Sequence, residues 1–280
     1  MAVVLALTSA VVYGASDFLG GLASRRTSVF GVVALSQVVG LVALVGLLPW
    51  LGGPVGAADL AWGAAAGLAG ATGLVVFFRT LSRGVMSVVA PVTAVTAAAL
   101  PVLVGLLAGD RVRTWTMVGI ALALAAVVLV SAEGGLSALR AARPASLRPA
   151  LVAGAAFGSF FVLLDRTSDG SGLTPLATAR LASVTFVVVL ALARSKSLRV
   201  TRPALPLVAV SGVGDMTANA FFLLATQADG QLAITGVLAS LYPVSTVILA
   251  QLVLRERLAG AQMAGLGTAV AVVVLITLPG

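Results

Sequence analysis

Residues 84–109 read GVMSVVAPVTAVTAAALPVLVGLLAG and contain no charged side chain. A helix needs roughly 20 consecutive, predominantly apolar residues to cross the hydrocarbon core of a bilayer, so this stretch is long enough to do so. The runs 114–132, 230–254 and 258–280 are also free of charge and reach or approach the same length. These four runs predict a membrane protein built of transmembrane helices.

The composition of the whole chain agrees with that prediction. Hydrophobic residues make up 60% and charged residues 9% of the 280 residues, against about 45–50% and about 25% in soluble domains. Too few charges remain for a water-facing surface, and the long apolar runs lack the alternation of barrel strands. The sequence also contains no cysteine and no histidine, which removes disulfides, thiolate nucleophiles and imidazole ligands. We therefore expect no cofactor and no metal site.

Charged loops and clusters of glycine and proline divide the chain into ten predicted spans. They run over residues 3–22, 29–50, 58–78, 85–108, 114–132, 149–164, 173–193, 204–226, 232–254 and 258–278. The only sizeable polar connector, residues 133–148, separates a first five-span repeat, 1–132, from a second one, 149–280.

The two halves share a pattern at a fixed offset of 146 residues. The matched pairs are Gly84 and Gly230, Asp110-Arg111 and Glu256-Arg257, Met117 and Met263, and Gly119 and Gly265. Near the start of each half, Tyr13-Gly14 and Phe157-Gly158 also correspond, at a slightly different offset. An odd number of spans per half inverts the second copy, and inverted repeats around a midplane site are typical of secondary transporters. The expected fold is an all-α integral membrane protein of ten transmembrane helices in two inverted five-helix repeats.

The loop charges test this count independently. Alternate loops, beginning with the first, carry 13 Lys and Arg residues in total, and the other loops carry 3. The positive-inside rule makes the more basic side cytoplasmic, which places Arg25-Arg26 and residues 194–202 inside and both termini outside. Because the net charge of +8 is spread over short loops between apolar spans, the expected partner of these residues is the lipid bilayer and not nucleic acid.

Three ionisable residues, Asp17, Arg180 and Asp215, lie well inside the predicted spans. A rise of about 1.5 Å per residue puts Asp17 roughly 21 Å, Asp215 roughly 16 Å and Arg180 roughly 10 Å from the face that carries the N-terminus. Both carboxylates thus fall near the middle of a core about 30 Å thick. An ionised side chain at that depth costs about 2.5–3.5 kcal/mol, so each is expected to face a partner or a water-filled cavity.

These three residues support two interpretations. In the functional one, Asp17 and Asp215 line a central cavity as proton carriers or as counter-charges for a cationic group on the substrate, because intramembrane charges usually mark pathways. In the structural one, a clamp between an aspartate and Arg180 merely fixes helix packing. We expect Arg180 to hold one carboxylate, and the acid farther from it, Asp17 by depth, to carry the proton.

Polar neighbours extend this candidate site. Tyr13 precedes Asp17 by one helical turn and Asn219 follows Asp215 by one turn, so each pair shares a helix face. Interhelical hydrogen bonding without a transport role is an equally open interpretation for Tyr13 and Asn219. Two further candidates for substrate binding or proton coupling are Ser16 and Tyr242.

Proline and glycine mark places where the helices are expected to bend or to approach closely. Pro91, Pro101 and Pro243 lie inside predicted spans, and each removes a helix hydrogen bond, which predicts kinks that expose backbone to substrate or that only bend the helix. The motifs Gly63-xxx-Gly67 and Gly154-xxx-Gly158 permit close helix contact.

Two other functions compete with a carrier. Gly212-Val213-Gly214-Asp215 matches the GxGD pattern of intramembrane aspartyl proteases, with Asp17 as the second carboxylate, although Ser16-Asp17 replaces their usual Tyr-Asp pair. A passive channel is the other alternative, but no selectivity-filter sequence or ring of like charges is present. The sequence has no phosphate-binding G-x-x-x-x-G-K-[ST] loop, so it gives no indication of an ATP-driven step.

The second half also resembles a known family. It contains Leu238-Ala-Ser-Leu-Tyr-Pro243 followed by Leu254-Arg-Glu256-Arg-Leu, and each half starts with an aromatic–Gly pair. These features resemble the drug/metabolite transporter superfamily, specifically its ten-helix EamA-type permeases, over nearly the whole chain. The chain departs from the family at Asp110, which replaces an acidic Glu, at Ala97, where the repeat predicts a proline, and at Asp17, a carboxylate that most relatives lack.

The resemblance implies a carrier that exports, less often imports, small metabolites or drugs by alternating access, and not an enzyme. It implies a cavity lined by the first, third, fourth, sixth, eighth and ninth spans. We expect a multi-pass protein of the cell membrane, a monomer or weak homodimer, whose partners are a small-molecule substrate, the bilayer and protons. Relatives are generally drawn with cytoplasmic termini, which is opposite to the orientation that the loop charges give.

Overall fold

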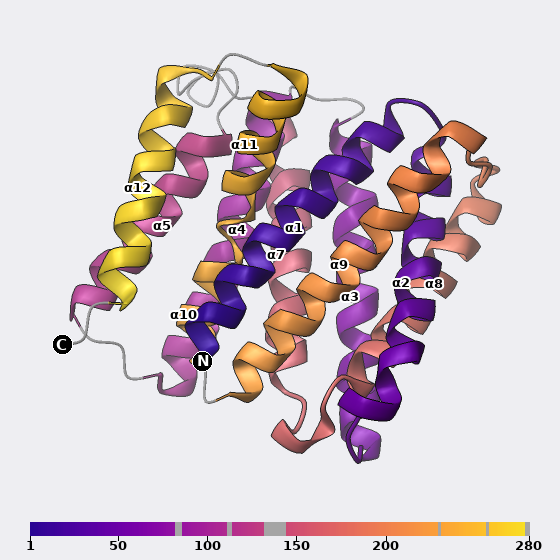
Figure 1. Ribbon diagram of the computed structural model, residues 1–280, viewed down its shortest axis with the longest axis horizontal. Coiled ribbons are helices and arrows are strands. Elements are labelled where there is room, and N and C mark those ends of the chain that lie inside the picture. The colour runs from indigo at the N-terminus through magenta and orange to yellow at the C-terminus, as the bar shows by residue number, and fades with distance from the viewer. Residues whose placement is uncertain (82–85, 111–113, 132–143, 229–230, 256–257, 278–280) are drawn as a thin grey trace.

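The computed structural model describes residues 1–81, 86–110, 114–131, 144–228, 231–255 and 258–277 of the chain. Within these ranges the regular elements are helices, and the sole extended pairing is an isolated antiparallel bridge between Gly52 and Gly172. Figure 1 shows the helices as one bundle in which the start of α1 and the end of α12 lie at the same end.

The first half contains five long helices, and the second half matches it with one helix divided in two. The helices of the first half are α1 (Ala2–Ser24), α2 (Val29–Leu51), α3 (Ala57–Leu81), α4 (Met86–Ala108) and α5 (Thr114–Ser131). Those of the second half are α7 (Pro144–Asp165), α8 (Thr174–Ala193), α9 (Leu205–Gln227), α10 (Leu232–Ala239), α11 (Tyr242–Leu254) and α12 (Gly260–Thr277). Short 3₁₀ turns, η1 (Asp169–Ser171) and η2 (Arg202–Ala204), precede α8 and α9.

The prediction of ten membrane spans is confirmed. Among the described residues, eight helices are long and apolar enough to cross a membrane, with α10 and α11 together forming one of them. Shorter apolar segments, Val92–Ala108 in α4 and Gly260–Ile276 in α12, supply the remaining two. One boundary differs, because α7 begins at Pro144, so the last residues of the expected connector, 144–148, are helical.

The ninth span breaks at Ser240 and Leu241, between α10 and α11. Pro243 lies in the first turn of α11, and since its nitrogen carries no hydrogen it cannot donate to the carbonyl of Ala239 four residues earlier. The equivalent helix α4 has Ala97 at the corresponding position and continues through both Pro91 and Pro101. Proline therefore interrupts one of the two equivalent spans and not the other.

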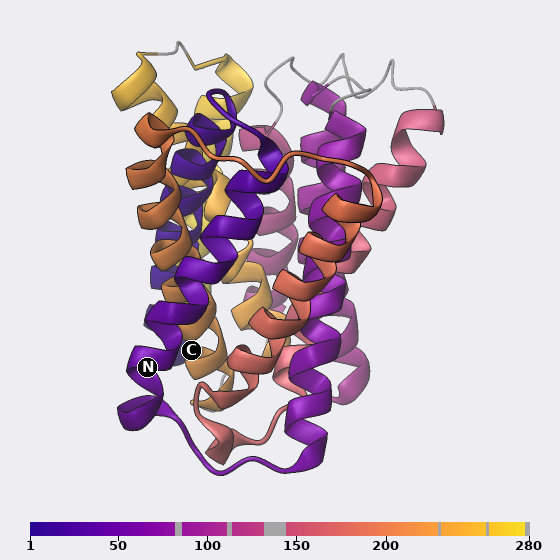
Figure 2. The same cartoon turned by 90° about the vertical axis from the view of Figure 1, so that its right-hand side faces the viewer.

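The helix contacts repeat when the two halves are exchanged. α1 packs on α9 as α7 packs on α3, and α2 packs on α9 as α8 packs on α3. α1 contacts α10 and α11 as α7 contacts α4, while α5 with α12 and α2 with α8 pair equivalent helices directly. α1 begins at the end that carries the N-terminus, whereas α7 begins at the opposite end (Figures 1 and 2). The two five-helix repeats are therefore inverted copies that pack against each other.

Both glycine motifs mediate the close helix contacts that they predict. A Cβ atom on Gly63 or Gly67 would overlap backbone of α8, at the carbonyls of Pro175 and Ala179. A Cβ atom on Gly154 would lie 2.5 Å from a carbonyl of α4, and one on Gly158 would lie 3.0 Å from another. These four glycines let backbones of the two halves approach within the membrane.

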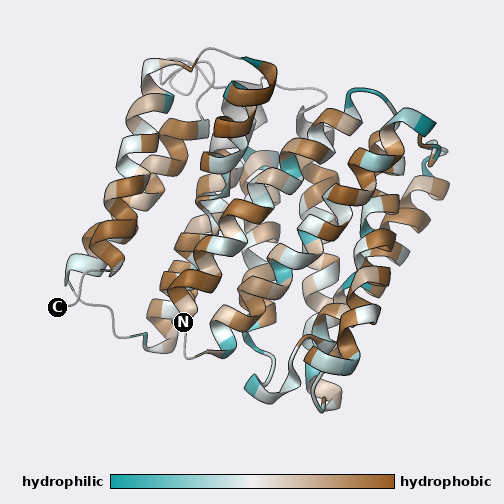
Figure 3. Cartoon of the chain, viewed as in Figure 1, coloured by the Kyte–Doolittle hydropathy of each residue, from teal (hydrophilic) through white to brown (hydrophobic). Residues whose placement is uncertain are grey.

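The two ends of the bundle differ in chemistry, and we call them the basic face and the N-terminal face. The basic face is the end with the α1–α2 and α8–α9 connections, which carry Arg25, Arg26 and residues 194–202. The N-terminal face is the opposite end, and the tryptophans of the chain lie near it, at Trp50, Trp62 and Trp115. Between the faces the helices are predominantly hydrophobic, as Figure 3 shows in brown, which suits a surface that contacts lipid.

Each face has its own connection between the two halves. At the basic face, the Thr27 hydroxyl donates to the Arg199 carbonyl at 3.1 Å. At the N-terminal face, the Gly53 amide donates to the Ser171 carbonyl at 3.1 Å and the Leu173 amide to the Leu51 carbonyl at 2.9 Å. The loops at both ends thus tie the first half to the second.

Candidate functional site

An ion pair between α8 and α9 lies at the centre of the bundle. The Arg180 guanidinium is 6% exposed and its Nη2 donates to Oδ2 of Asp215. Its Nη1 donates to Oε1 of Gln37 on α2, and its Nε lies 3.4 Å from the sulfur of Met216. A buried charge needs such partners, because desolvation without them costs several kcal/mol. The structure therefore pairs Arg180 with Asp215.

Gln37 is the polar residue of this site that sequence reasoning missed. Its amide oxygen accepts from Arg180 and, at 3.3 Å, from the hydroxyl of Ser183. An amide inside the apolar span 29–50 was a usable signal, since polar side chains within membrane helices seek partners on neighbouring helices.

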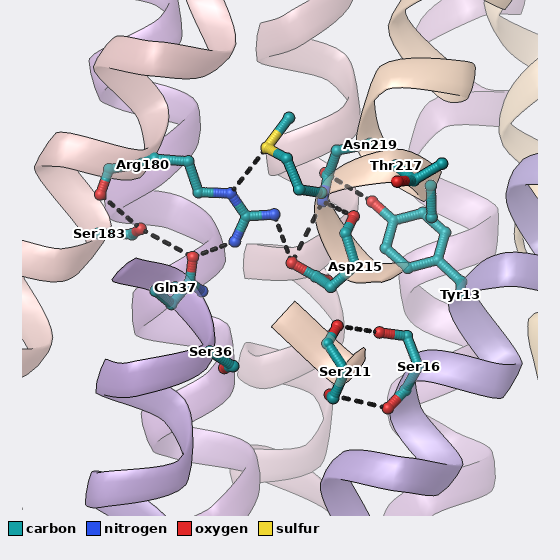
Figure 4. A network of polar contacts seen from close by, with 12 residues as sticks. Tyr13, Ser16, Ser36, Gln37, Arg180, Ser183, Ser211, Asp215, Thr217 and Asn219 are labelled. Atoms are coloured by element: carbon teal, nitrogen blue, oxygen red, sulfur yellow. Dashed lines mark hydrogen bonds and ion pairs between the residues drawn. The ribbon is translucent and has the colours of Figure 1, made fainter. Parts of the chain in front are cut away.

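Hydrogen bonds connect the ion pair to α1. The Tyr13 hydroxyl donates to Oδ1 of Asn219 at 2.6 Å, and Nδ2 of Asn219 donates to the backbone carbonyl of Asp215 at 2.7 Å. The same nitrogen lies 3.5 Å from the Asp215 carboxylate. Figure 4 shows the resulting chain, which runs from Tyr13 through Asn219 and Asp215 to Arg180 and Gln37. Four helices, α1, α9, α8 and α2, meet in this network.

Ser16 is used for packing between α1 and α9. Its hydroxyl donates to the Ser211 carbonyl, and the Ser211 hydroxyl donates back to the Ser16 carbonyl at 2.9 Å (Figure 4). About two turns nearer the N-terminus of α1, the Ser9 hydroxyl donates to the Ala218 carbonyl at 2.8 Å. Ser16 is 2% exposed, so its side chain faces α9 and not open space.

Asp17 has a different environment from Asp215. It lies one turn after Tyr13, on the helix face that points to Asn219 and the second half, and its side chain is exposed. Among the described residues no hydrogen bond or ion pair reaches its carboxylate. The site thus contains one neutralised carboxylate and one unpaired carboxylate.

Tyr242 is brought beside Tyr13 by a tight contact between α1 and α11. A Cβ atom on Gly14 would overlap the Tyr242 carbonyl, and the Thr246 hydroxyl donates to the Gly14 carbonyl at 3.0 Å. The rings of Tyr13 and Tyr242 have centroids 6.4 Å apart at an interplanar angle of 55°. Tyr242 is the first residue of α11, so the break in the ninth span lies directly beside this tyrosine pair.

Phenylalanines continue this aromatic surface into the second half. Phe161 of α7 meets Tyr13 edge to face, with centroids 6.2 Å apart. The Phe161 ring also contacts Phe222 of α9 at 4.5 Å and Phe160 at 5.4 Å between centroids. One end of the site is therefore charged and the other end is apolar and flat.

The predicted site residues are thus distributed unevenly. Tyr13, Asp215, Arg180 and Asn219 form one hydrogen-bonded chain, with Tyr242 and Asp17 beside it. Pro91 and Pro101 lie on α4, outside this network. No cluster of three acidic, histidine or cysteine side chains that could bind a metal occurs in the part of the chain that the structure describes.

Ten helices in two inverted repeats, with charged and polar side chains where the repeats meet, are the architecture of a membrane transporter. The profile of the EamA-like transporter family matches residues 1–132 and 149–278. The chain therefore belongs to that family, which lies within the drug/metabolite transporters, as the motifs around Pro243 and Glu256 predict.

Comparison with solved structures agrees at the level of the fold. A crystal structure of a protein 18% identical in sequence, one of 28 solved chains that match, has a TM-score of 0.80. The match covers 99% of this chain and 96% of that chain. No curated protein matches the chain.

Family membership favours a transporter over the aspartyl protease that the GxGD pattern suggests. In such a protease two carboxylates together activate one water molecule. Here the Asp215 carboxylate is instead bound by Arg180, and the glycines of the pattern serve packing: a Cβ atom on Gly212 would overlap the backbone of Ser36 on α2.

Proposed function

We propose that the protein is a secondary-active carrier that moves a small molecule across the cell membrane by alternating access, coupled to protons. In this mechanism Asp17 binds and releases the proton, and the Arg180–Asp215 pair holds the opposite wall of the site. We further propose that transport runs outward and that the monomer or a weak homodimer is the working form. Residues 1–132 and 149–280 are the two units that move relative to each other.

The unequal state of the two carboxylates carries this proposal. Asp215 has a fixed cation within hydrogen-bonding distance, so adding a proton to it would break the ion pair with Arg180. Asp17 has no such partner among the described residues and is exposed, so a proton, or a cation in its place, can neutralise it without breaking any bond. A group that is free to exchange its counter-charge is what coupling requires.

The hydrogen-bonded chain supplies a route by which Asp17 can influence α9. Asp17 and Tyr13 lie on the same helix, and Tyr13 is joined through Asn219 to the backbone and carboxylate of Asp215. Any movement of α1 on protonation therefore acts on the ion pair between α9 and α8. The coupling travels through bonds that join the two halves.

The broken ninth span and the two loop connections suit a change of access. α10 and α11 meet at Ser240 and Leu241, where the Leu241 amide donates to the Leu238 carbonyl three residues earlier and Pro243 has no amide hydrogen to donate. We propose that this interruption is a hinge at which α10 and α11 rotate relative to each other. The connections at the basic face, through Thr27 and Arg199, and at the N-terminal face, through Gly53 and Ser171, join the same two halves from opposite ends. We propose that one connection opens while the other stays closed.

The test is transport into proteoliposomes with and without an imposed pH gradient, beginning with a screen of amines, amino acids and neutral metabolites. Asp17→Asn keeps the shape of the side chain but removes its titration, so gradient-driven accumulation should be lost while passive exchange continues. Asp169→Asn, which removes an exposed carboxylate at the N-terminal face, is the matched control and should behave as wild type. If Asp17→Asn folds normally and still concentrates substrate against its gradient, the coupling assignment is wrong.

A further inference from the structure

We propose that the substrate is an organic cation, an ammonium group joined to a flat apolar body, which places its positive end between Asp17, Tyr13 and Tyr242. This inference rests on the proposed transport function and names its substrate class. The unpaired carboxylate, the two tyrosine rings beside it and the phenylalanines beyond them are the observations that lead to it.

The charge balance of the site requires a positive ligand. The described charges of the central site are Asp17, Asp215 and Arg180, and Arg180 neutralises Asp215. One negative charge is left over at Asp17. An isolated charge inside the membrane is costly, and either a proton or a cationic ligand removes that cost. An anionic ligand would add a second negative charge and find no free cation, because Arg180 already donates to Asp215 and Gln37.

The two tyrosine rings supply the second attraction. Aromatic faces attract cations within about 6 Å of the ring centroid, and the gain grows when water is excluded. The ring centroids of Tyr13 and Tyr242 stand 6.4 Å apart and the rings are tilted at 55°. The Tyr13 hydroxyl is occupied by Asn219, whereas the Tyr242 hydroxyl has no hydrogen-bond partner among the described residues. No hydrogen bond of its hydroxyl to a described residue therefore holds Tyr242 in place when a ligand binds.

The site also offers aromatic surface to the flat body of the ligand. Phe161 is half-buried and meets Tyr13 edge to face, and behind it Phe161 packs on Phe160 and on the fully buried Phe222. The accessible aromatic surface therefore continues from the tyrosines onto Phe161 of α7, where an aromatic ring of a ligand can pack edge to face or offset. A cation without an apolar body would use the carboxylate and leave this surface unused.

Direct binding to the purified, detergent-solubilised full-length protein tests the proposal by isothermal titration calorimetry with three probes. Benzyltrimethylammonium carries both the charge and the ring, tetramethylammonium lacks the ring, and benzyl alcohol lacks the charge. We expect benzyltrimethylammonium to bind most tightly, tetramethylammonium more weakly, and benzyl alcohol not measurably.

Two variants, each with a matched control, assign the binding to these residues. Asp17→Asn should weaken benzyltrimethylammonium binding at least about tenfold, since it removes a charge-assisted contact, and Asp169→Asn should leave it unchanged. Tyr242→Leu should weaken it by about two- to thirtyfold, the range of one cation–π contact, while Tyr242→Phe, which keeps the ring, should bind nearly as wild type. Tyr242→Leu also keeps the proposal testable if Asp17→Asn does not fold.

The outcomes separate the substrate class from the proposed function. Equal affinity for benzyl alcohol and benzyltrimethylammonium, or unchanged binding in both Asp17→Asn and Tyr242→Leu, overturns the organic-cation proposal. If no cation binds while a neutral or anionic solute accumulates with the pH gradient and loses that accumulation in Asp17→Asn, the substrate class is wrong and proton-coupled transport stands. If cations bind but no gradient drives their accumulation, the proposed coupling fails and the binding site stands.

Discussion

The interface of α1 with α9 and the interface of α7 with α3 are equivalent in the fold and opposite in chemistry. Across the first, Tyr13 bonds to Asn219 and Ser16 bonds reciprocally with Ser211. At an offset of 144 residues, the counterparts of Tyr13, Ser16 and Asp17 are Phe157, Phe160 and Phe161.

At the second interface, Phe157 and Phe160 lie over glycines of α3. A Cβ atom on Gly73 would lie 2.8 Å from the Phe157 ring, and one on Gly70 would lie 3.1 Å from the Phe160 ring. Phe77 adds an edge-to-face contact with Phe157 at 6.1 Å. The duplicated backbone therefore fixes where helices meet, while the side chains make the α1–α9 interface polar and the α7–α3 interface flat and apolar. The asymmetry of the site comes from sequence and not from fold.

The largest expected effect is that of Asp215→Asn on the polar interface. It leaves the buried Arg180 guanidinium without its carboxylate, and losing one partner of a buried pair costs about 3–5 kcal/mol. Thermal unfolding in detergent and the yield of folded protein should both fall. The double variant Asp215→Asn/Arg180→Gln removes the orphaned charge and should recover most of the loss. If Asp215→Asn alone is as stable as wild type, the Arg180–Asp215 pair does not stabilise the polar interface.

A second comparison uses two equivalent glycines, Gly14 in α1 and Gly158 in α7. A Cβ atom on Gly14 would overlap the fixed backbone carbonyl of Tyr242, whereas one on Gly158 would lie 2.7 Å from the Leu100 side chain and 3.0 Å from the Ala97 carbonyl. Overpacking of this kind costs about 1–3 kcal/mol, and we expect Gly14→Ala near the upper end and Gly158→Ala nearer the lower. Thermal unfolding of both variants measures the difference.

The control for that pair is Gly46→Ala on α2, because nothing lies within 4 Å of a Cβ atom there. It should be neutral or stabilising by about 0.5–1 kcal/mol. Equal losses in Gly14→Ala and Gly158→Ala would show that the two interfaces respond alike, in spite of their different chemistry.

The smallest expected effect comes from making the two halves more alike. Tyr13→Phe gives α1 the residue that α7 has at Phe157 and removes one hydrogen bond to Asn219. Interhelical hydrogen bonds in membrane proteins average about 0.6 kcal/mol, so stability should change little and the KM for transport should rise about threefold. Phe157→Leu is the matched change on the other interface and should leave KM unaltered. A transport rate that collapses in Tyr13→Phe would give the hydroxyl a larger role than this.

Much of the fold could be predicted from the sequence because the bilayer imposes a simple rule on length and charge. Charge-free runs such as 84–109 and 258–280 contain α4 and α12, and the break beside Tyr242 follows from the missing amide hydrogen of Pro243. The expected span 149–164 agrees with the apolar segment Leu147–Asp165, and α7 itself begins earlier, at Pro144, because a helix can extend beyond the part of it that is apolar enough to cross the membrane.

For the site, the sequence could indicate which residues belong to it but not how they contact one another. Depth estimates put Asp215 nearer to Arg180 than Asp17, and the structure pairs Arg180 with Asp215, although the long Arg180 side chain spans more than the difference in depth. Ser16 stands next to Asp17 in sequence, yet one residue turns a helix by about 100° and points Ser16 at Ser211. Gln37 carries no charge, so a search for ionisable residues inside the spans passed it over, although an amide in the apolar span 29–50 was a usable signal.

The position of the tryptophans has a practical consequence for experiments in vesicles. Trp50 and Trp115 are 78% and 70% exposed, and Trp62 is 40% exposed, all toward the N-terminal face. Ultraviolet emission from this protein therefore originates close to one membrane surface. A collisional quencher that cannot cross the bilayer, added outside sealed vesicles, will dim only those molecules that present that surface outward. The native chain thus reports its own insertion orientation without a dye, and the dimmed fraction converts a flux measured on a mixed population into separate inward and outward rates.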